Sequence, residues 1–235
     1  MSVRLAVFRF LLFWIAGATG TSVASAQSTY FREEIAAKEG KGPAVLIISG
    51  QTGPEPRRSY ARDVAALGYT VLLVDGNDML SRTKPAAQNF KDAVASLLAS
   101  PNTTSKKVAV IGFSLGGGAV LSHAVNQPDV IAGALAVYPF TAWIQNVDGL
   151  IGRFQVPITV LAAGADSYNN CCLIDKARDI EKVAKAKGKA FDMVVYENAD
   201  HGYDLTGRNY RTDYVRDTWK RTEEWLKRTH ADTGK

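Results

Sequence analysis

Ser114 lies in the stretch GFSLG (112–116), which fits the pattern G-x-S-x-G. An apolar run precedes the stretch and a glycine-dense segment follows it, which predicts a strand, a sharp turn and a helix. A serine in such a turn can act as a nucleophile, because the first N–H groups of the helix face a developing oxyanion. The glycines fit this geometry, since side chains two positions before and after the serine would collide where the helix passes the strand. This pattern predicts a nucleophile elbow at Ser114.

Two phosphate-binding interpretations of the same stretch fail on its residues. A P-loop needs Gly-Lys-Ser/Thr after four spacer residues, and no lysine lies here. The dinucleotide fingerprint GxGxxG needs a glycine where Ser114 stands. A helix packed through small residues is the remaining alternative, and the partners of the serine decide against it.

A serine nucleophile needs a general base, and the chain has three histidines. His123 falls in the helix that begins at the elbow, on the wrong side for catalysis. His230 is in the polar C-terminal region. His201, in ENADHGYDL, follows the last predicted strand and precedes the last helix, where its ring can reach the serine. His201 is therefore the predicted base.

The acid of such a group should follow a strand between Ser114 and His201. Asp166 comes two residues after the predicted strand PITVLAAG (157–164), although an aspartate there also suits a helix N-cap. Asp200 is too close in the chain to orient its neighbour's ring, and Asp75 precedes the serine. The order Ser114, Asp166, His201 is typical of α/β-hydrolase triads.

An oxyanion hole needs two N–H donors beside the serine. The backbone N–H of Leu115 is the first by its position in the elbow. The second is expected from the loop that follows the predicted strand AVLIIS (44–49), where we predict Gln51, with Thr52 as the alternative.

The elements that must position these residues alternate regularly along the chain. Short apolar runs predict strands, and segments with helical spacing of apolar residues predict helices between them. Such alternation is typical of one mostly parallel, doubly wound sheet in a single α/β domain. Segment 139–156 is irregular and too short to form a large lid domain. The predicted strands are 44–49, 70–75, 107–113, 130–139, 157–164 and 190–197, and the predicted helices are 57–68, 85–100, 115–127, 173–188 and 214–228.

The composition is that of a globular protein, with 46% hydrophobic and 22% charged residues among 235. The net charge is +5, and basic residues are scattered rather than clustered, which argues against a nucleic-acid partner. Without a metal-binding spacing of cysteines and histidines, we expect no metal and no organic cofactor.

The first 26 residues resemble a secretory leader. Two arginines precede the apolar run FLLFWIAGA, and ASA (24–26) offers small residues before a cleavage site. The run is shorter than the ~20 residues that span a bilayer, so cleavage after Ala26 is favoured over an uncleaved anchor. The expected product is an exported chain, 27–235, periplasmic or secreted, with 26 basic and 23 acidic residues and a net charge of +3.

Cys171 and Cys172 are adjacent. Neighbouring Cα atoms lie about 3.8 Å apart, closer than the usual window of roughly 4.4–6.8 Å for bridged cysteines. A disulfide between adjacent residues and a pair of buried free thiols both remain open.

These motifs together resemble the dienelactone hydrolase family of α/β-hydrolases. The resemblance covers nearly the whole of 27–235 and rests on the elbow, on YARDVAALGYTVLLVD, on AAGAD and on DHGY. The best-known members of that family use a cysteine nucleophile, where this chain has Ser114. A glutamate that poises the family cysteine corresponds here to Gly50, and the arginines that bind the substrate carboxylate have no clear match. DSYNNCC (166–172) also replaces a shorter turn of the family.

The resemblance implies hydrolysis of small carboxylic esters by a serine hydrolase, with an acyl-enzyme intermediate. Tyr138, Trp143, Tyr168 and Tyr203 are candidate pocket residues. A peptidase or thioesterase on the same triad, and a binding protein that has kept the hydrolase fold, are the alternatives. The sequence leaves the oligomeric state open.

Overall fold

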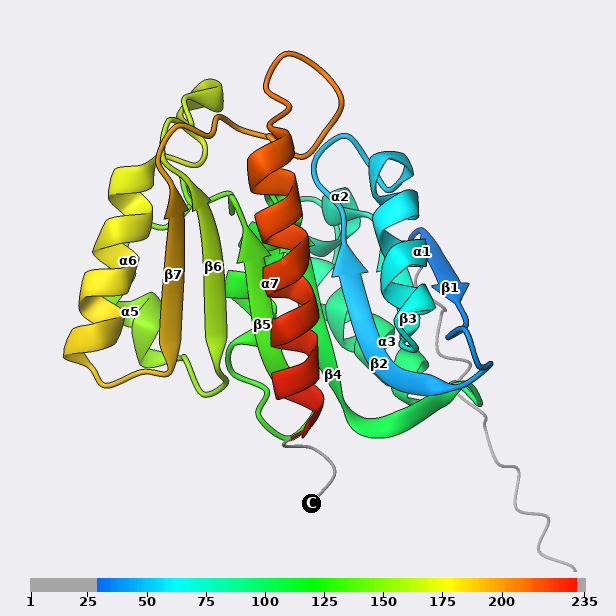
Figure 1. Cartoon of the computed structure of the whole chain (residues 1–235). Coiled ribbons are helices and arrows are strands. Elements are labelled where there is room, and N and C mark those ends of the chain that lie inside the picture. The colour runs from blue at the N-terminus through cyan, green and yellow to red at the C-terminus, as the bar shows by residue number, and fades with distance from the viewer. Residues whose placement is uncertain (1–28, 232–235) are drawn as a thin grey trace, which may run out of the picture.

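The computed structural model describes residues 29–231 and forms one seven-stranded sheet in the order β1-β3-β2-β4-β5-β6-β7 (Figure 1). Every neighbouring pair is parallel except β1 and β3, which are antiparallel. The strands are β1 (Arg32–Ile35), β2 (Gly42–Ile48), β3 (Thr70–Val74), β4 (Thr103–Phe113), β5 (Ile131–Val137), β6 (Ile158–Ala163) and β7 (Phe191–Tyr196). The predicted leader, residues 1–26, lies outside the described residues.

Helices cover both faces of the sheet, as expected for parallel strands. In Figure 1, α1 and α7 lie in front of the sheet, and α3 lies behind it. The helices are α1 (Arg58–Ala66), α2 (Gly76–Met79), α3 (Ala86–Leu98), α4 (Leu115–Ala119), α5 (Val147–Gly152), α6 (Ile174–Ala186) and α7 (Thr212–Ala231), with short turns η1 (Glu55–Arg57), η2 (Val120–Ala124) and η3 (Tyr168–Asn170). Among residues 29–231, no helix is long and apolar enough to cross a membrane.

The core consists of two clusters, one on each face of the sheet. Alternate residues of β2 show the division: Leu46 belongs to the cluster with α3 and α6, whereas Val45 and Ile47 belong to the cluster with α1 and α7. This alternation follows from the pleat, which points successive side chains to opposite faces. Both faces are apolar, which explains why the central strands appear in the sequence as unbroken apolar runs.

The sheet order reverses direction between β2 and β4. The chain passes from β2 to β3 on one side and then returns to β4 on the other side of β2. In open α/β sheets, the crevice at such a reversal is where ligands bind, at the carboxyl ends of the strands. The loop after β2 carries Gln51, and the turn after β4 carries Ser114, so the two meet at this point.

The main departures from the sequence prediction are short or partly exposed elements. Strand β1 at the sheet edge was not predicted, nor were α2 and α5, and α5 lies within the segment expected to be irregular. The helix predicted over 115–127 ends earlier: α4 stops at Ala119 and continues as the π-helical turn η2 to Ala124.

Candidate active site

Ser114 occupies a strained turn between the end of β4 and the start of α4. Its φ of 53° and ψ of −113° lie in a region that residues with a side chain rarely adopt. A Cβ on Gly112 would lie 2.2 Å from the carbonyl oxygen of Gly116, and one on Gly116 would lie 2.3 Å from that of Ile48. Both glycines are therefore required by close backbone contacts, as the elbow pattern predicts.

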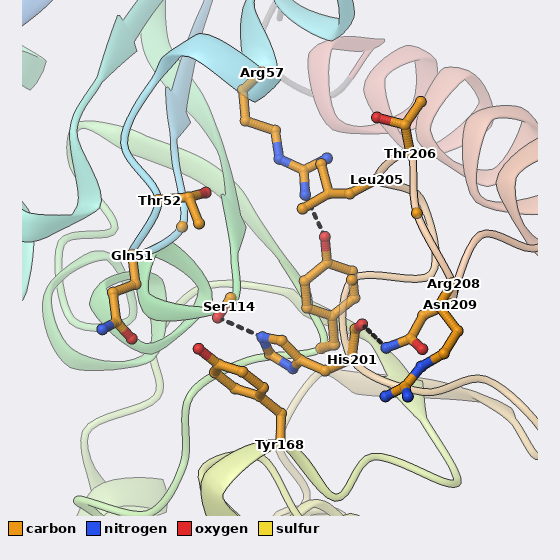
Figure 2. Close-up of a pocket in the computed structure, with 14 residues that line it drawn as sticks. Gln51, Thr52, Arg57, Ser114, Tyr168, His201, Leu205, Thr206, Arg208 and Asn209 are labelled. Carbon is orange, nitrogen blue, oxygen red and sulfur yellow. Dashed lines mark hydrogen bonds between the residues drawn. The ribbon is translucent and has the colours of Figure 1, made fainter.

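The structure brings Ser114, His201 and Asp166 together from three separate loops. The Oγ atom of Ser114 lies 2.8 Å from Nε2 of His201, and Nδ1 of His201 lies 2.7 Å from Oδ2 of Asp166 (Figure 2 draws the Ser114 contact). An ionised carboxylate only accepts hydrogen bonds. In the neutral ring, Nδ1 therefore carries the proton, and Nε2 is free to accept the serine proton.

Burial shields this group from water. The side chain of Asp166 is fully buried and that of His201 is 12% exposed. The other oxygen of Asp166, Oδ1, accepts the backbone N–H of Tyr168 at 3.1 Å. The neighbouring Asp200 accepts backbone N–H groups of His201 and Ser167, at 2.7 and 3.4 Å, and no contact joins its carboxylate to the imidazole ring.

A cavity of about 400 Å³ opens beside Ser114 (Figure 2). The loop after β2 forms one wall, and the segment after His201 forms the opposite wall. The lining residues of this cavity are Gly50, Gln51, Thr52, Arg57, Ser114, Tyr138, Tyr168, His201, Gly202, Leu205, Thr206, Gly207, Arg208 and Asn209.

A smaller hollow of about 190 Å³ shares Ser114, Gln51 and Tyr168 with this cavity. It also contains Leu115, so both predicted oxyanion donors lie with the serine in one place. Leu115 is the first residue of α4, and the N–H of a first helical residue has no acceptor within its own helix. The remaining lining residues are Phe140, Ala142, Asn169 and Cys171.

The four candidate aromatic residues have different positions. Tyr138 and Tyr168 line the cavity, and Tyr168 stacks on the His201 ring with centroids 4.9 Å apart and an interplanar angle of 11°. Trp143 lines a separate groove with Leu80 and Arg82. Tyr203 does not reach the cavity, because it is fully buried between Tyr138 and α7 and its hydroxyl lies 2.8 Å from that of Thr218.

A buried charged network supports the cavity and was not predicted from the sequence. The guanidinium of Arg57 contacts both oxygens of Asp204, at 2.5 and 3.1 Å, and donates to the hydroxyl of Tyr138. It also lies 3.9 Å from the centre of the Phe113 ring. Burial disfavours its charge, but Tyr138 and Asp204 outweigh burial and hold the pKa of Arg57 above its ordinary value. Burial also raises the pKa of Tyr138, which keeps the phenol protonated.

Cys171 and Cys172 form a disulfide, which answers the question that the sequence left open. The sulfur atoms and the side-chain donor atoms of Asp166 and His201 all lie within 4.8 Å of one another. Both sulfurs are used in the bridge, and the other two groups bind each other.

Solved structures with the same architecture identify the fold. A structure titled "Putative Dienelactone Hydrolase" from Klebsiella pneumoniae superposes with a TM-score of 0.68 at 18% identity, covering 84% of this chain and 98% of that one. Est1E from Butyrivibrio proteoclasticus gives a TM-score of 0.66 at 14% identity, covering 85% and 94%. These likenesses confirm the predicted α/β-hydrolase fold, with one mostly parallel sheet.

Sequence comparison identifies the family. A "Putative carboxymethylenebutenolidase" from Saccharolobus solfataricus is 29% identical over 215 residues, which is 88% of this chain and 78% of that protein. Cutinase 2 of Thermobifida cellulosilytica is 28% identical over 131 residues, which is 53% of this chain and 48% of that protein. The model of the dienelactone hydrolase family matches residues 76–230. The chain therefore belongs to the dienelactone hydrolase family of α/β-hydrolases.

Proposed function

We propose that this protein is a serine hydrolase that cleaves small carboxylic esters through an acyl-enzyme intermediate. The observation that carries the proposal is the continuous contact from Ser114 Oγ through the His201 ring to buried Asp166. The likeness to carboxymethylenebutenolidases and cutinases, which are ester hydrolases, supports the reaction class.

In the first step, Oγ of Ser114 attacks the ester carbonyl while Nε2 of His201 takes its proton. Asp166 stabilises the imidazolium that forms and holds the ring in the tautomer that the geometry requires. The N–H groups of Leu115 and Gln51 bind the oxyanion. These groups are built into the fold, so little reorganisation accompanies the appearance of charge.

In the second step, the tetrahedral intermediate collapses and His201 gives its proton to the leaving alkoxide. The acyl group stays on Ser114 until a water molecule, deprotonated by the same His201, attacks it. A second proton transfer returns the serine hydroxyl and releases the acid. No step in this route calls for a metal or an organic cofactor.

The shape of the site supports small substrates. The cavity of about 400 Å³ is in the range of pockets that enclose small molecules. Arg57 lines it, but its charge is already paired with Asp204, so it offers no free cation to a substrate carboxylate. Neutral esters therefore suit the part of this cavity beside Arg57, whereas the exposed Arg208 leaves a cation elsewhere in the lining.

A serine-directed fluorophosphonate probe tests the proposal. The wild type and Ser122→Ala, which alters a serine in the turn after α4, should be labelled, whereas Ser114→Ala should not. Labelling of Ser114→Ala at the wild-type rate, or no labelling of the wild type, would sink the enzyme proposal. A panel of short-chain nitrophenyl esters, matching thioesters and peptide amides then separates esterase from thioesterase and peptidase activity.

Export is a further proposal, supported by the leader pattern of residues 1–26. When the full chain is expressed in a bacterium, the protein recovered outside the cytoplasm should begin at Gln27. An intact Met1 on that fraction contradicts cleavage.

A further inference from the structure

The disulfide follows directly on the turn that holds the acid and base of the active site. The turn η3 (Tyr168–Asn170) begins two residues after Asp166, and Cys171 comes next. The sulfur atoms of both cysteines are within 4.8 Å of side-chain atoms of Asp166 and His201. Cys171 also lines the hollow that contains Ser114.

A bridge between adjacent residues does little to restrict the unfolded chain. The stabilisation from a disulfide grows with the number of residues in the loop it closes. Here the sequence separation is one, so almost no loop is closed. What the bridge does restrict is the local backbone, because both residues become part of one eight-membered ring. Its effect should therefore be local to the turn.

Hydrogen bonds connect this turn to the nucleophile elbow. The carbonyl of Cys171 accepts the N–H groups of Thr141 and Ala142, both at 2.9 Å. The preceding residue in that segment, Phe140, donates its N–H to the carbonyl of Ser114 at 2.8 Å. A shift of the Cys171 backbone is therefore transmitted to the segment that contacts the elbow.

Tyr168 connects the same turn to the acid and base. Its N–H binds Oδ1 of Asp166, its ring stacks on His201, and its carbonyl accepts the N–H of Cys171 at 2.9 Å. The residue is 48% exposed, so surrounding packing fixes its ring only in part. The next two residues, Asn169 and Asn170, have φ of 49° and 53°, a left-handed backbone that asparagine adopts more readily than most residues with a side chain. The ring closed by the disulfide follows this turn directly.

We propose that the Cys171–Cys172 disulfide is a positioning element that holds Tyr168 against the His201 ring and keeps Asp166 aligned with it. The proposal rests on the hydrolase function proposed above. Opening the bridge relaxes the turn, frees the Tyr168 ring from His201 and weakens the transfer of the serine proton. The expected result is a loss of kcat rather than a loss of substrate affinity.

The test compares oxidised wild type, wild type reduced with dithiothreitol, and the double variant Cys171→Ala/Cys172→Ala. The dithiol supplies two electrons and two protons to the bridge and is itself oxidised to a cyclic disulfide. With a short-chain nitrophenyl ester, kcat of the reduced wild type and of the double variant should fall about tenfold to a hundredfold, as a displacement near 1 Å does in an active site. KM should change much less, and dithiothreitol should not affect the double variant.

A double-mutant cycle that combines Tyr168→Ala with the cysteine replacements tests whether the bridge acts through the Tyr168 ring. If the bridge acts through Tyr168, this substitution lowers kcat in the oxidised protein and adds little once the cysteines are replaced, because the two changes disrupt the same contact. Tyr168→Phe, which keeps the ring and the backbone N–H, should lose less kcat than Tyr168→Ala and should keep the response to reduction. Fully additive losses in the cycle contradict the proposal.

Other outcomes overturn the inference in separate ways. An unchanged kcat on reduction shows that the bridge does not position the site. A rise in KM alone would show that the bridge only lines the hollow and affects substrate binding. Loss of the native circular-dichroism signal on reduction would show that the bridge is a crosslink that stabilises the fold. Fluorophosphonate labelling of the oxidised protein is measured in parallel, because its absence contradicts the hydrolase proposal itself rather than the role of the bridge.

Discussion

Asp166 and Asp200 both contact His201, but they accept hydrogen bonds from different atoms of it. Asp166 binds the ring at Nδ1, whereas Asp200 binds the backbone N–H. Only the first contact can set the tautomer of the ring. Asp166→Asn should therefore lower kcat by about 10⁴-fold, because an amide can present its N–H group to Nδ1 and stabilise the wrong tautomer. Steady-state hydrolysis of a nitrophenyl ester measures the loss.

Asp200→Asn is the matched control, since it makes the same change of charge at the residue next to His201. The amide oxygen still accepts a backbone N–H, so kcat should stay near the wild-type value. A larger loss in Asp200→Asn than in Asp166→Asn would reverse the assignment of the acid.

Arg57 and Asp204 form an ion pair with side chains only 6% and 8% exposed. Removing one partner leaves an uncompensated buried charge, which costs about 3–5 kcal/mol. Arg57→Met should lower the free energy of unfolding by that amount, measured by urea denaturation. The double variant Arg57→Met/Asp204→Leu should recover part of the loss, because no charge is then left unpaired.

Arg58 provides the control for this prediction. It pairs with Glu33 and Glu55, but its side chain is 33% exposed. Arg58→Gln should therefore lower the free energy of unfolding by less than about 1 kcal/mol. Equal losses at positions 57 and 58 would show that the buried pair contributes no more than a surface pair.

Individual residues differ in how well their positions follow from the sequence. Ser114, His201 and Asp166 could be predicted as neighbours, because each follows a strand of a parallel sheet and such ends share one edge. Arg57 could not, since its partner Asp204 lies 147 residues away and an arginine beside a helix is usually solvated. Tyr203 is one of the four candidate pocket aromatic residues, but its ring lies fully buried in the core.

At the scale of elements, the elbow is a close contact between α4 and β2. A Cβ on Gly116 would lie 2.3 and 2.5 Å from the carbonyl oxygens of Ile48 and Ser49, which belong to the backbone and cannot rotate away. Gly116→Ala should displace α4 and the N–H of Leu115, and should lower kcat/KM by roughly a hundredfold or more. Thermal melting of the same variant should show a lower Tm.

Gly152→Ala is the control for the added methyl group. Nothing lies within 4 Å of a Cβ at this position, the last residue of α5. The activity should be unchanged, and stability should be equal to the wild type or higher by up to about 1 kcal/mol, because alanine loses less backbone entropy in a helix. Loss of activity in Gly152→Ala would mean that an added methyl group lowers activity even far from the elbow, so the loss in Gly116→Ala would not be specific to the elbow.

Element prediction succeeded where burial is complete. Strands β2 to β7 pack on both faces or lie next to strands that do, so they appear as apolar runs, and their ends differ from the prediction by a few residues. The edge strand β1 is REEI, with alternating exposed and half-buried residues and no apolar run. The helix α5 has six residues, too few for a helical period to be visible.

For the whole molecule, the half-buried His230 links stability to pH. His230 lies near the end of α7 with its ring centre 5.3 Å from that of Tyr69, and burial lowers its pKa to about 4. In the unfolded chain, its pKa is about 6.5. Between these values the unfolded state binds a proton that the folded state does not, so the free energy of unfolding falls as the pH drops from about 6.5 towards 4.

His230→Gln removes this titration and should flatten the dependence, by at most about 1.4 kcal/mol per pH unit relative to the wild type. Some slope should remain, because burial also lowers the pKa of His123. Urea unfolding at pH 7, 6, 5 and 4.5 measures the difference, with the exposed Lys227→Gln as the control that keeps the wild-type slope. Parallel curves for the wild type and His230→Gln would contradict the assignment.

The direction of α7 has a practical consequence for how the protein can be attached to a surface. The active-site loops leave the carboxyl ends of the strands, and α7 runs from that edge to the opposite one, where Ala231 ends the described chain (Figure 1). A support or fusion partner joined after α7 would therefore lie at the far edge of the sheet, with the cavity facing away from it. Immobilisation through the C-terminal side should leave substrate access open, whereas crosslinking through the 205–209 segment should block it.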